Sequence, residues 1–196
     1  MKLPIAWIAL FGMTASAIAQ QGWTQADTHA IEWRHNVRAA RLTPAQMARL
    51  KKITGSELQA CSDDELPREA KVGLADFPIE PATLAPDKSG FAVQGMGSCM
   101  CGAVGNCPFW LLDSDMHLLI ASRAQEFALL PQLKNGMRNV VLRLHGSATD
   151  SSWALYQFDG KHYRPSQCAD VNYSPNPDRI LKRPKVTPQR CDEWKE

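Results

Sequence analysis

The chain has 196 residues and a formal net charge of +2 at pH 7, with 22 Lys and Arg residues against 20 Asp and Glu. This length is enough for one domain with a hydrophobic core. The near-neutral charge balance argues against a nucleic acid or another polyanion as partner, because such partners bind clustered basic residues.

The first 19 residues have the pattern of a secretory signal peptide. Lys2 gives a positive start, the run from Pro4 to Met13 is uncharged and mostly apolar, and Ala17-Ile18-Ala19 matches the small-x-small cleavage pattern. Ala15-Ser16-Ala17 matches it as well, so cleavage two residues earlier is an alternative. The apolar run is shorter than the roughly 20 residues of a bilayer span. We therefore expect a periplasmic or secreted protein, cleaved near Ala19, with no membrane span in the mature chain.

Residues 20–90 are expected to form a helical N-terminal region followed by a Pro-rich connector. Thr43-Pro44-Ala45-Gln46 has the form of a capping box with Pro at the first helical position. Apolar residues recur every three positions after it, and Gly55 is a plausible stop. A second helix is expected to begin earlier, near Asp27. An acidic triplet at 63–65 and several prolines predict that residues 61–90 run over the surface without regular structure.

Residues 91–170 show the alternation and the turn residues of short antiparallel strands. Turns are expected at Asp113-Ser114-Asp115, Asn135-Gly136 and Asp159-Gly160, with strands at 91–95, 109–112, 116–120, 127–130, 137–145, 152–158 and 161–164. Consecutive strands joined by short turns pair as an antiparallel meander. Residues 171–196 are rich in Pro and are expected to form an extended tail. The expected fold class is α+β, mainly β: an antiparallel β-meander with one or two N-terminal helices, stapled by disulfides.

Six cysteines in an exported chain indicate disulfides, although six cysteines allow fifteen complete pairings. Cys99 and Cys101 are too close in sequence to pair easily with each other. The favoured set pairs Cys101 with Cys107 to close a Gly-rich loop, Cys168 with Cys191 to hold the tail, and Cys61 with Cys99 to join the helical part to the strands.

Two stretches carry a resemblance to a known family. The loop CGAVGNCPFW at 101–110 and the segment LYQFDGKHYRPSQC at 155–168 resemble an uncharacterised family of exported bacterial proteins with a CGxxGNCPxW-type loop and an FDGxxY hairpin. The resemblance covers roughly the C-terminal half and implies no catalytic residue. Asn135-Gly136 and Phe158-Asp159-Gly160 are also locally similar to blades of FG-GAP-type β-propellers. The calcium-binding loop of those blades is not matched, and one blade does not close a propeller.

Motifs for catalysis or metal binding are missing from the sequence. There is no G-x-S-x-G or H-E-x-x-H pattern, and an even cysteine count leaves no free thiol nucleophile. Cys99, Cys101 and Cys107 offer three soft metal ligands, but in an oxidising compartment a disulfide loop is the preferred interpretation. We therefore expect no cofactor and assign no catalytic or metal-binding residue. His145, His162 and Asp150 lie at adjacent expected strand ends, which keeps a hydrolase open as the alternative.

The best candidate binding surface is the cysteine loop with the aromatic residues beside it. A loop that is already rigid loses less entropy on binding, and aromatic side chains are typical anchors. At least one of Phe109 and Trp110 must face the core, because neighbours on a strand point to opposite sides. The candidate binding residues are Met100, Gly102, Gly105, Asn106, Phe109 and Trp110.

From this surface we expect a non-catalytic periplasmic or secreted binding protein whose partner is an unidentified protein or envelope polymer. An inhibitor of an envelope-active enzyme is the narrower form of this expectation. The alternatives are a hydrolase of envelope or extracellular polymers and a purely structural envelope component.

Overall fold

The structure is a computed structural model that describes residues 31, 33, 40–61, 72–173 and 184–194. The expected signal peptide at 1–19 and the acidic triplet at 63–65 lie outside the described residues. So does most of the helix expected from Asp27, and its two described residues, Ile31 and Trp33, are not helical. Within the described ranges, no helix combines the length and apolar character needed to cross a bilayer.

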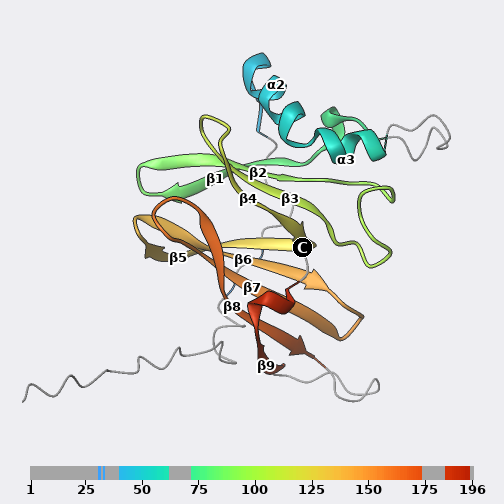
Figure 1. Ribbon diagram of the computed structural model, residues 1–196, viewed down its shortest axis with the longest axis vertical. Coiled ribbons are helices and arrows are strands. Elements are labelled where there is room, and N and C mark those ends of the chain that lie inside the picture. The colour runs from blue at the N-terminus through green and yellow to red at the C-terminus, as the bar shows by residue number, and fades with distance from the viewer. Residues whose placement is uncertain (1–30, 32, 34–39, 62–71, 174–183, 195–196) are drawn as a thin grey trace, which may run out of the picture.

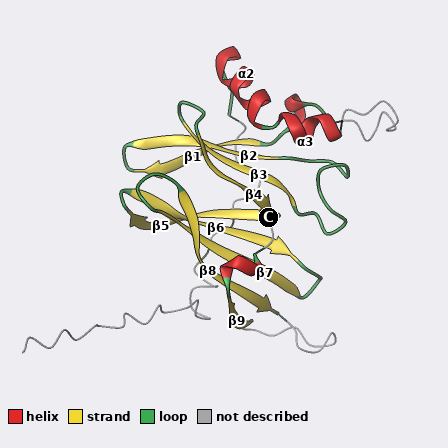
Figure 2. Ribbon diagram, in the orientation of Figure 1, coloured by secondary structure: helices red, strands yellow, loops and turns green. Residues whose placement is uncertain are grey.

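The described residues form nine strands in two antiparallel sheets that lie one above the other (Figures 1 and 2). The first sheet has the order β1-β2-β3-β4 and the second β5-β6-β7-β8-β9, so each is a meander, as expected for this mainly β fold. The strands are β1 (Ile79–Ala85), β2 (Lys88–Gln94), β3 (Cys107–Asp113), β4 (Leu118–Ala124), β5 (Glu126–Lys134), β6 (Met137–His145), β7 (Asp150–Phe158), β8 (Tyr163–Asn172) and β9 (Lys185–Gln189).

The chain passes from one sheet to the other at Gln125, which separates β4 from β5. The Gln125 backbone N–H donates to the Arg143 carbonyl of the second sheet. The Gln94 side chain of the first sheet donates to the carbonyls of both Ala124 and Gln125. The polar backbone groups at this corner are therefore satisfied from both sheets, and one run of strands is divided into two layers.

The prediction that residues 61–90 lack regular structure is wrong for the second half of that range. Ile79–Ala85 pairs with Lys88–Gln94 as a β-hairpin, and a short 3-10 helix precedes it at Leu74–Asp76. Pro81 is tolerated within β1 because β1 is an edge strand, whose outer side needs no ladder hydrogen bonds. The tail differs from expectation in the same way, because β9 contains Pro188 and pairs with β8 as the other sheet's edge.

Two helices, α2 (Pro44–Ile53) and α3 (Gly55–Ala60), lie over the outer face of the first sheet (Figure 1). The expected capping box is present at the start of α2: the Thr43 side chain accepts the backbone N–H of Gln46, and the Gln46 side chain accepts the backbone N–H of Thr43. α2 ends at Ile53, just before the stop expected at Gly55, and Gly55 begins the second short helix, α3.

Both faces of both sheets are covered over part of their area. Between the sheets lies the main core, in which Phe109, Leu111 and Val140 are fully buried. The helices bury Trp110 on the outside of the first sheet. On the outside of the second sheet, Trp33 packs edge-to-face on Trp153 with ring centroids 5.0 Å apart. Fully burying one large apolar side chain stabilises a fold by about 1.5–3 kcal/mol, so three such layers make a substantial core.

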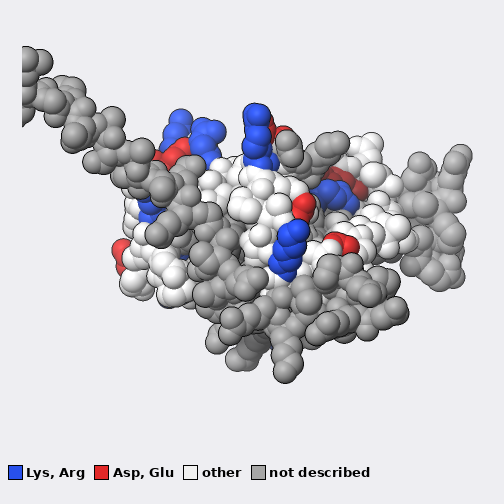
Figure 3. Space-filling model, turned by 90° about the horizontal axis from the view of Figure 1, so that it is seen from below, with Lys and Arg blue, Asp and Glu red and all other residues white. Residues whose placement is uncertain are grey.

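Three disulfides join Cys61 to Cys99, Cys101 to Cys107, and Cys168 to Cys191, and no cysteine is free. These are the pairs that the sequence favours. On the described part of the face shown in Figure 3, Lys and Arg side chains are scattered and interspersed with Asp and Glu. That face therefore presents no continuous field of one sign.

Candidate functional site

A cleft of about 510 Å³ opens at the end of the sandwich where the turns of four hairpins meet. In a meander, alternate turns lie at the same end of the sheet. The turns after β1 and β3 in the first sheet and those after β5 and β7 in the second lie at this end. Residues at or beside all four turns line the cleft: Asp87 and Lys88, Ser114 and His117, Met137, and Lys161 and His162.

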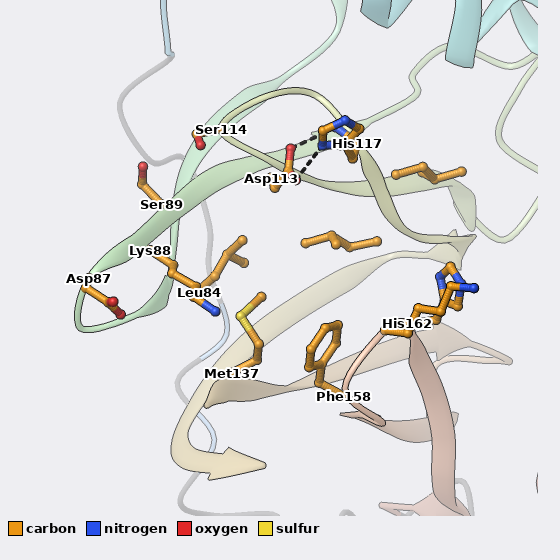
Figure 4. Close-up of a pocket in the computed structure, with 13 residues that line it drawn as sticks. Leu84, Asp87, Lys88, Ser89, Asp113, Ser114, His117, Met137, Phe158 and His162 are labelled. Atoms are coloured by element: carbon orange, nitrogen blue, oxygen red, sulfur yellow. Dashed lines mark hydrogen bonds and ion pairs between the residues drawn. The ribbon is translucent and has the colours of Figure 1, made fainter. Parts of the chain in front are cut away.

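The floor of the cleft is apolar and continuous with the core between the sheets. Leu84 of the first sheet and Met137 of the second are almost fully buried, and Leu119 and Phe158 pack against the same core. Figure 4 shows Met137 and Phe158 on the second sheet and Leu84 on the first, with the gap between them. A ligand that enters the cleft would therefore contact carbon and sulfur atoms at its base.

The turn between β3 and β4 places a carboxylate–imidazole pair on the rim. Oδ1 of Asp113 accepts the backbone N–H of Asp115 at 2.9 Å and of His117 at 2.8 Å. Oδ2 of Asp113 lies 2.8 Å from Nδ1 of His117 (Figure 4). The Asp113 carboxylate thus closes its own turn and orients the imidazole.

Helix α2 supports the same turn from outside. Gln46 donates its side-chain N–H to the carbonyl of Ser114 at 3.3 Å, and Arg49 donates to the carbonyl of Asp115. These contacts connect the capping-box helix predicted from the sequence to the rim of the cleft, which lies more than 60 residues further along the chain.

The turn between β7 and β8 is held by a second aspartate. Oδ1 of Asp159 accepts the backbone N–H of His162 at 2.7 Å and of Lys161 at 2.8 Å, and Oδ2 accepts from Nε of Arg164 at 2.7 Å. These hydrogen bonds, with that from His162 the largest contribution, hold the pKa of Asp159 well below its usual range. The FDG motif of the sequence therefore fixes the backbone that carries Lys161 and His162.

Lys88 and Lys161 line the cleft from opposite sheets. Among the described residues, neither lies within salt-bridge distance of a carboxylate. Of the two carboxylates that line the cleft, Asp113 is already engaged by its own turn and by His117. Among the described lining residues, the rim therefore offers more unengaged cationic than anionic side chains.

The aromatic anchors expected beside the cysteine loop are not on the surface, so that part of the prediction is wrong. Phe109 is 0% exposed and packs against Phe127 between the sheets, with ring centroids 5.1 Å apart. Trp110 is 3% exposed and stacks on Phe77 under the helices, and Met100 is 5% exposed. Both neighbours on β3 are buried because both faces of the first sheet are covered at this point.

The loop itself is exposed but its polar groups are used internally. Asn106 donates its side-chain N–H to the His145 carbonyl at 2.9 Å and accepts the His145 backbone N–H at 2.7 Å. Arg123 donates to the carbonyls of Met100 and Asn106. Gly102 and Gly105 are exposed, and Gly105 adopts a left-handed φ of +78° that suits glycine.

His145, His162 and Asp150, which the sequence allowed to converge, do not come together. His145 pairs with Ser151 at the beginning of β7, whereas His162 follows the end of β7. At a rise of about 3.3 Å per residue, a strand of this length separates the two histidines by roughly 25 Å. His162 instead shares the cleft with the Asp113–His117 pair, which the sequence had indicated only as a turn.

No cluster of three or more potential metal ligands occurs among the described residues. Comparison of the chain with protein-family models, with curated proteins and with solved structures finds no match. The residues that line the cleft are therefore the basis for its function.

Proposed function

We propose that this chain is an exported binding protein and that its ligand site is the cleft at the hairpin-turn end of the sandwich. The observation that carries the proposal is a concavity with an apolar floor and a polar rim assembled from hairpin turns of both sheets. Small-ligand sites have this construction, with apolar walls and a few placed polar groups, and commonly enclose about 300–1,000 Å³. The occupant is a small molecule or the end group of a polymer.

Export is supported by the cysteines. All six are paired within the chain. Disulfides of this kind persist in the periplasm or outside the cell, whereas cytosolic thiols are kept reduced. The signal-peptide pattern of the first 19 residues supports the same location.

Binding is favoured over catalysis because the cleft has no activated nucleophile among its described residues. Ser89 and Ser114 line it, but neither makes a hydrogen bond to a histidine ring. Hydrolysis through a bound water remains the second candidate. It is favoured by one observation: the Asp113 carboxylate orients the His117 ring, which is how a general base is commonly held.

The proposal is tested by NMR on the processed protein with ¹³C-labelled methionine methyl groups. Met137 reports on the cleft floor, and Met96, 40% exposed in the loop after β2, is the matched reporter at the other end. Fragments from a chemically diverse library are expected to shift the Met137 signal saturably and to leave Met96 unchanged. The variant Leu119→Trp, which fills the cleft, should abolish the shift while keeping a cooperative melting transition.

Two outcomes would overturn this function. A library that shifts only Met96, or no methionine at all, would remove the cleft as a ligand site. If the unmodified protein hydrolyses ester, amide or glycoside probes and His117→Ala does not, the function of the cleft is hydrolysis and not binding.

A further inference from the structure

We infer that the ligand of this cleft is a small anionic amphiphile, with an oxyanion head group at the rim and an aliphatic or aromatic body on the floor. This inference rests on the proposed function and adds the chemical class of the ligand to it. Figure 4 shows the arrangement, with Lys88 on the β1–β2 side of the gap and His162 on the opposite side.

The apolar part of the ligand follows from the floor. Leu84, Leu119, Met137 and Phe158 present only carbon and sulfur atoms, and they belong to the core cluster between the sheets. A polar body would lose its hydration there without gaining hydrogen bonds, which is unfavourable. Methionine and leucine side chains adapt to aliphatic or aromatic bodies of differing shape, so the floor selects for apolar character more than for one outline.

The sign of the head group follows from which rim charges are already engaged. Asp113 accepts two backbone N–H groups and lies against the His117 ring, so both of its carboxylate oxygens are already engaged within its own turn. Lys88 and Lys161 have no carboxylate within salt-bridge distance among the described residues. His117 and His162 add ring nitrogens on the same rim. Within the described part of the chain, Asp87 is the one lining carboxylate left to oppose these two lysines.

The two cations border the cleft from opposite sides. Lys88 begins β2 in the first sheet, and Lys161 lies in the β7–β8 turn of the second, so they approach the mouth of the cleft from both layers. The Asp159 hydrogen bonds fix the backbone of Lys161, which lowers the backbone entropy lost when this residue engages a ligand. An oxyanion at either ammonium group would make charge-assisted hydrogen bonds, the stronger kind.

The test uses three probes with the same eight-carbon chain: octanoate, 1-octanol and octylammonium, each titrated below its aggregation concentration while the Met137 methyl signal is followed. Octanoate is expected to bind roughly tenfold more tightly than octanol, with octylammonium the weakest. The octanoate preference should shrink as salt is raised, because exposed charges are screened.

A charge-matched pair of variants separates head-group recognition from general electrostatics. Lys88→Gln with Lys161→Gln should reduce octanoate binding to the octanol level and leave octanol unchanged. Lys51→Gln with Lys52→Gln changes the net charge equally on the exposed end of α2 and should leave both affinities unchanged. Equal loss of octanoate binding in both double variants would overturn the head-group site.

The outcomes of the probe titrations distinguish the ligand class from the proposed function of the cleft. If octanol binds at Met137 as tightly as octanoate, or octylammonium binds most tightly, the ligand class is wrong while the cleft remains a binding site. If none of the three probes, nor any fragment of the library, shifts Met137, both the ligand class and the proposed function fail.

Discussion

The two ends of the sandwich are held together by different means. One end is cross-linked and bonded internally, and the other leaves side chains available to a ligand. At one end, the loop at 95–106 is tied by two disulfides, by Arg123 and by the reciprocal hydrogen bonds between Asn106 and His145. At the other end, Asp113 and Asp159 close short turns with their own carboxylates. The first end uses its polar groups on itself, and the second leaves lysine and histidine side chains facing a cleft.

The reason lies in the connections themselves. The segment 95–106 joins two neighbouring strands without regular pairing of its own, so ordering it costs backbone entropy that cross-links offset. The turns at the cleft end span only a few residues, and those after β3 and β7 are each closed by one aspartate. Covalent staples therefore mark where this chain needs stabilisation, whereas the candidate ligand site lies where local turn chemistry suffices.

The largest expected effect breaks the loop end and tests whether the two ends are independent. Cys61→Ser with Cys99→Ser opens a cross-link with a sequence separation of 38, and Cys101→Ser with Cys107→Ser one of 6. From loop-closure entropy, the losses in unfolding free energy are about 4 and about 2 kcal/mol, measured by denaturant unfolding. Both variants should retain the octanoate response at Met137. A lost response in a variant that is still folded would show that the loop end supports the cleft.

A smaller effect is expected from Asn106→Ala. The substitution leaves the backbone N–H and the carbonyl of His145 without their side-chain partner, which costs about 1–3 kcal/mol when such groups are not rehydrated. Hydrogen exchange at the His145 amide should accelerate, while the amides of Lys161 and His162 at the cleft keep their protection. Equal acceleration at both ends would contradict the view that Asn106 serves only the loop.

Local chemistry made much of the fold predictable. The Thr43 and Gln46 capping box, the Asn135-Gly136 turn and the Asp159-Gly160 turn are each encoded within a few residues, and each is present. Asn135 and Gly136 adopt φ values of +50° and +78°, the conformation that these two residue types favour. The three disulfide pairs are the set that the sequence favoured among fifteen possible pairings.

What could not be predicted depends on contacts between distant segments. Pro81 indicates a break in a strand when the sequence is taken alone. Its position on an edge strand, where proline is tolerated, is a property of the assembled sheet. Phe109 and Trp110 looked like one core residue and one anchor, because the helices that cover the outer face of β3 are remote in sequence. The cleft is built from turns spread over residues 84–162, and no single segment carries its pattern.

The smallest expected effect sharpens the comparison through pH, because the loop at 95–106 contains no carboxylate whereas the cleft turns depend on them. Hydrogen bonds from His162, Arg164 and Lys161 lower the pKa of Asp159 in the folded protein. A lowered pKa means that the stabilisation is present above the unfolded-state value of about 3.9 and is lost as the pH falls below it.

Asp159→Asn should therefore melt a few degrees below the unmodified protein at pH 7, and the gap in melting temperature should close towards pH 2. The group is exposed, so solvent screening keeps the effect small. A gap in melting temperature that stays constant between pH 7 and pH 2 would mean that Asp159 holds the turn through its shape and not through its charge. The cleft end would then be as insensitive to acid as the loop.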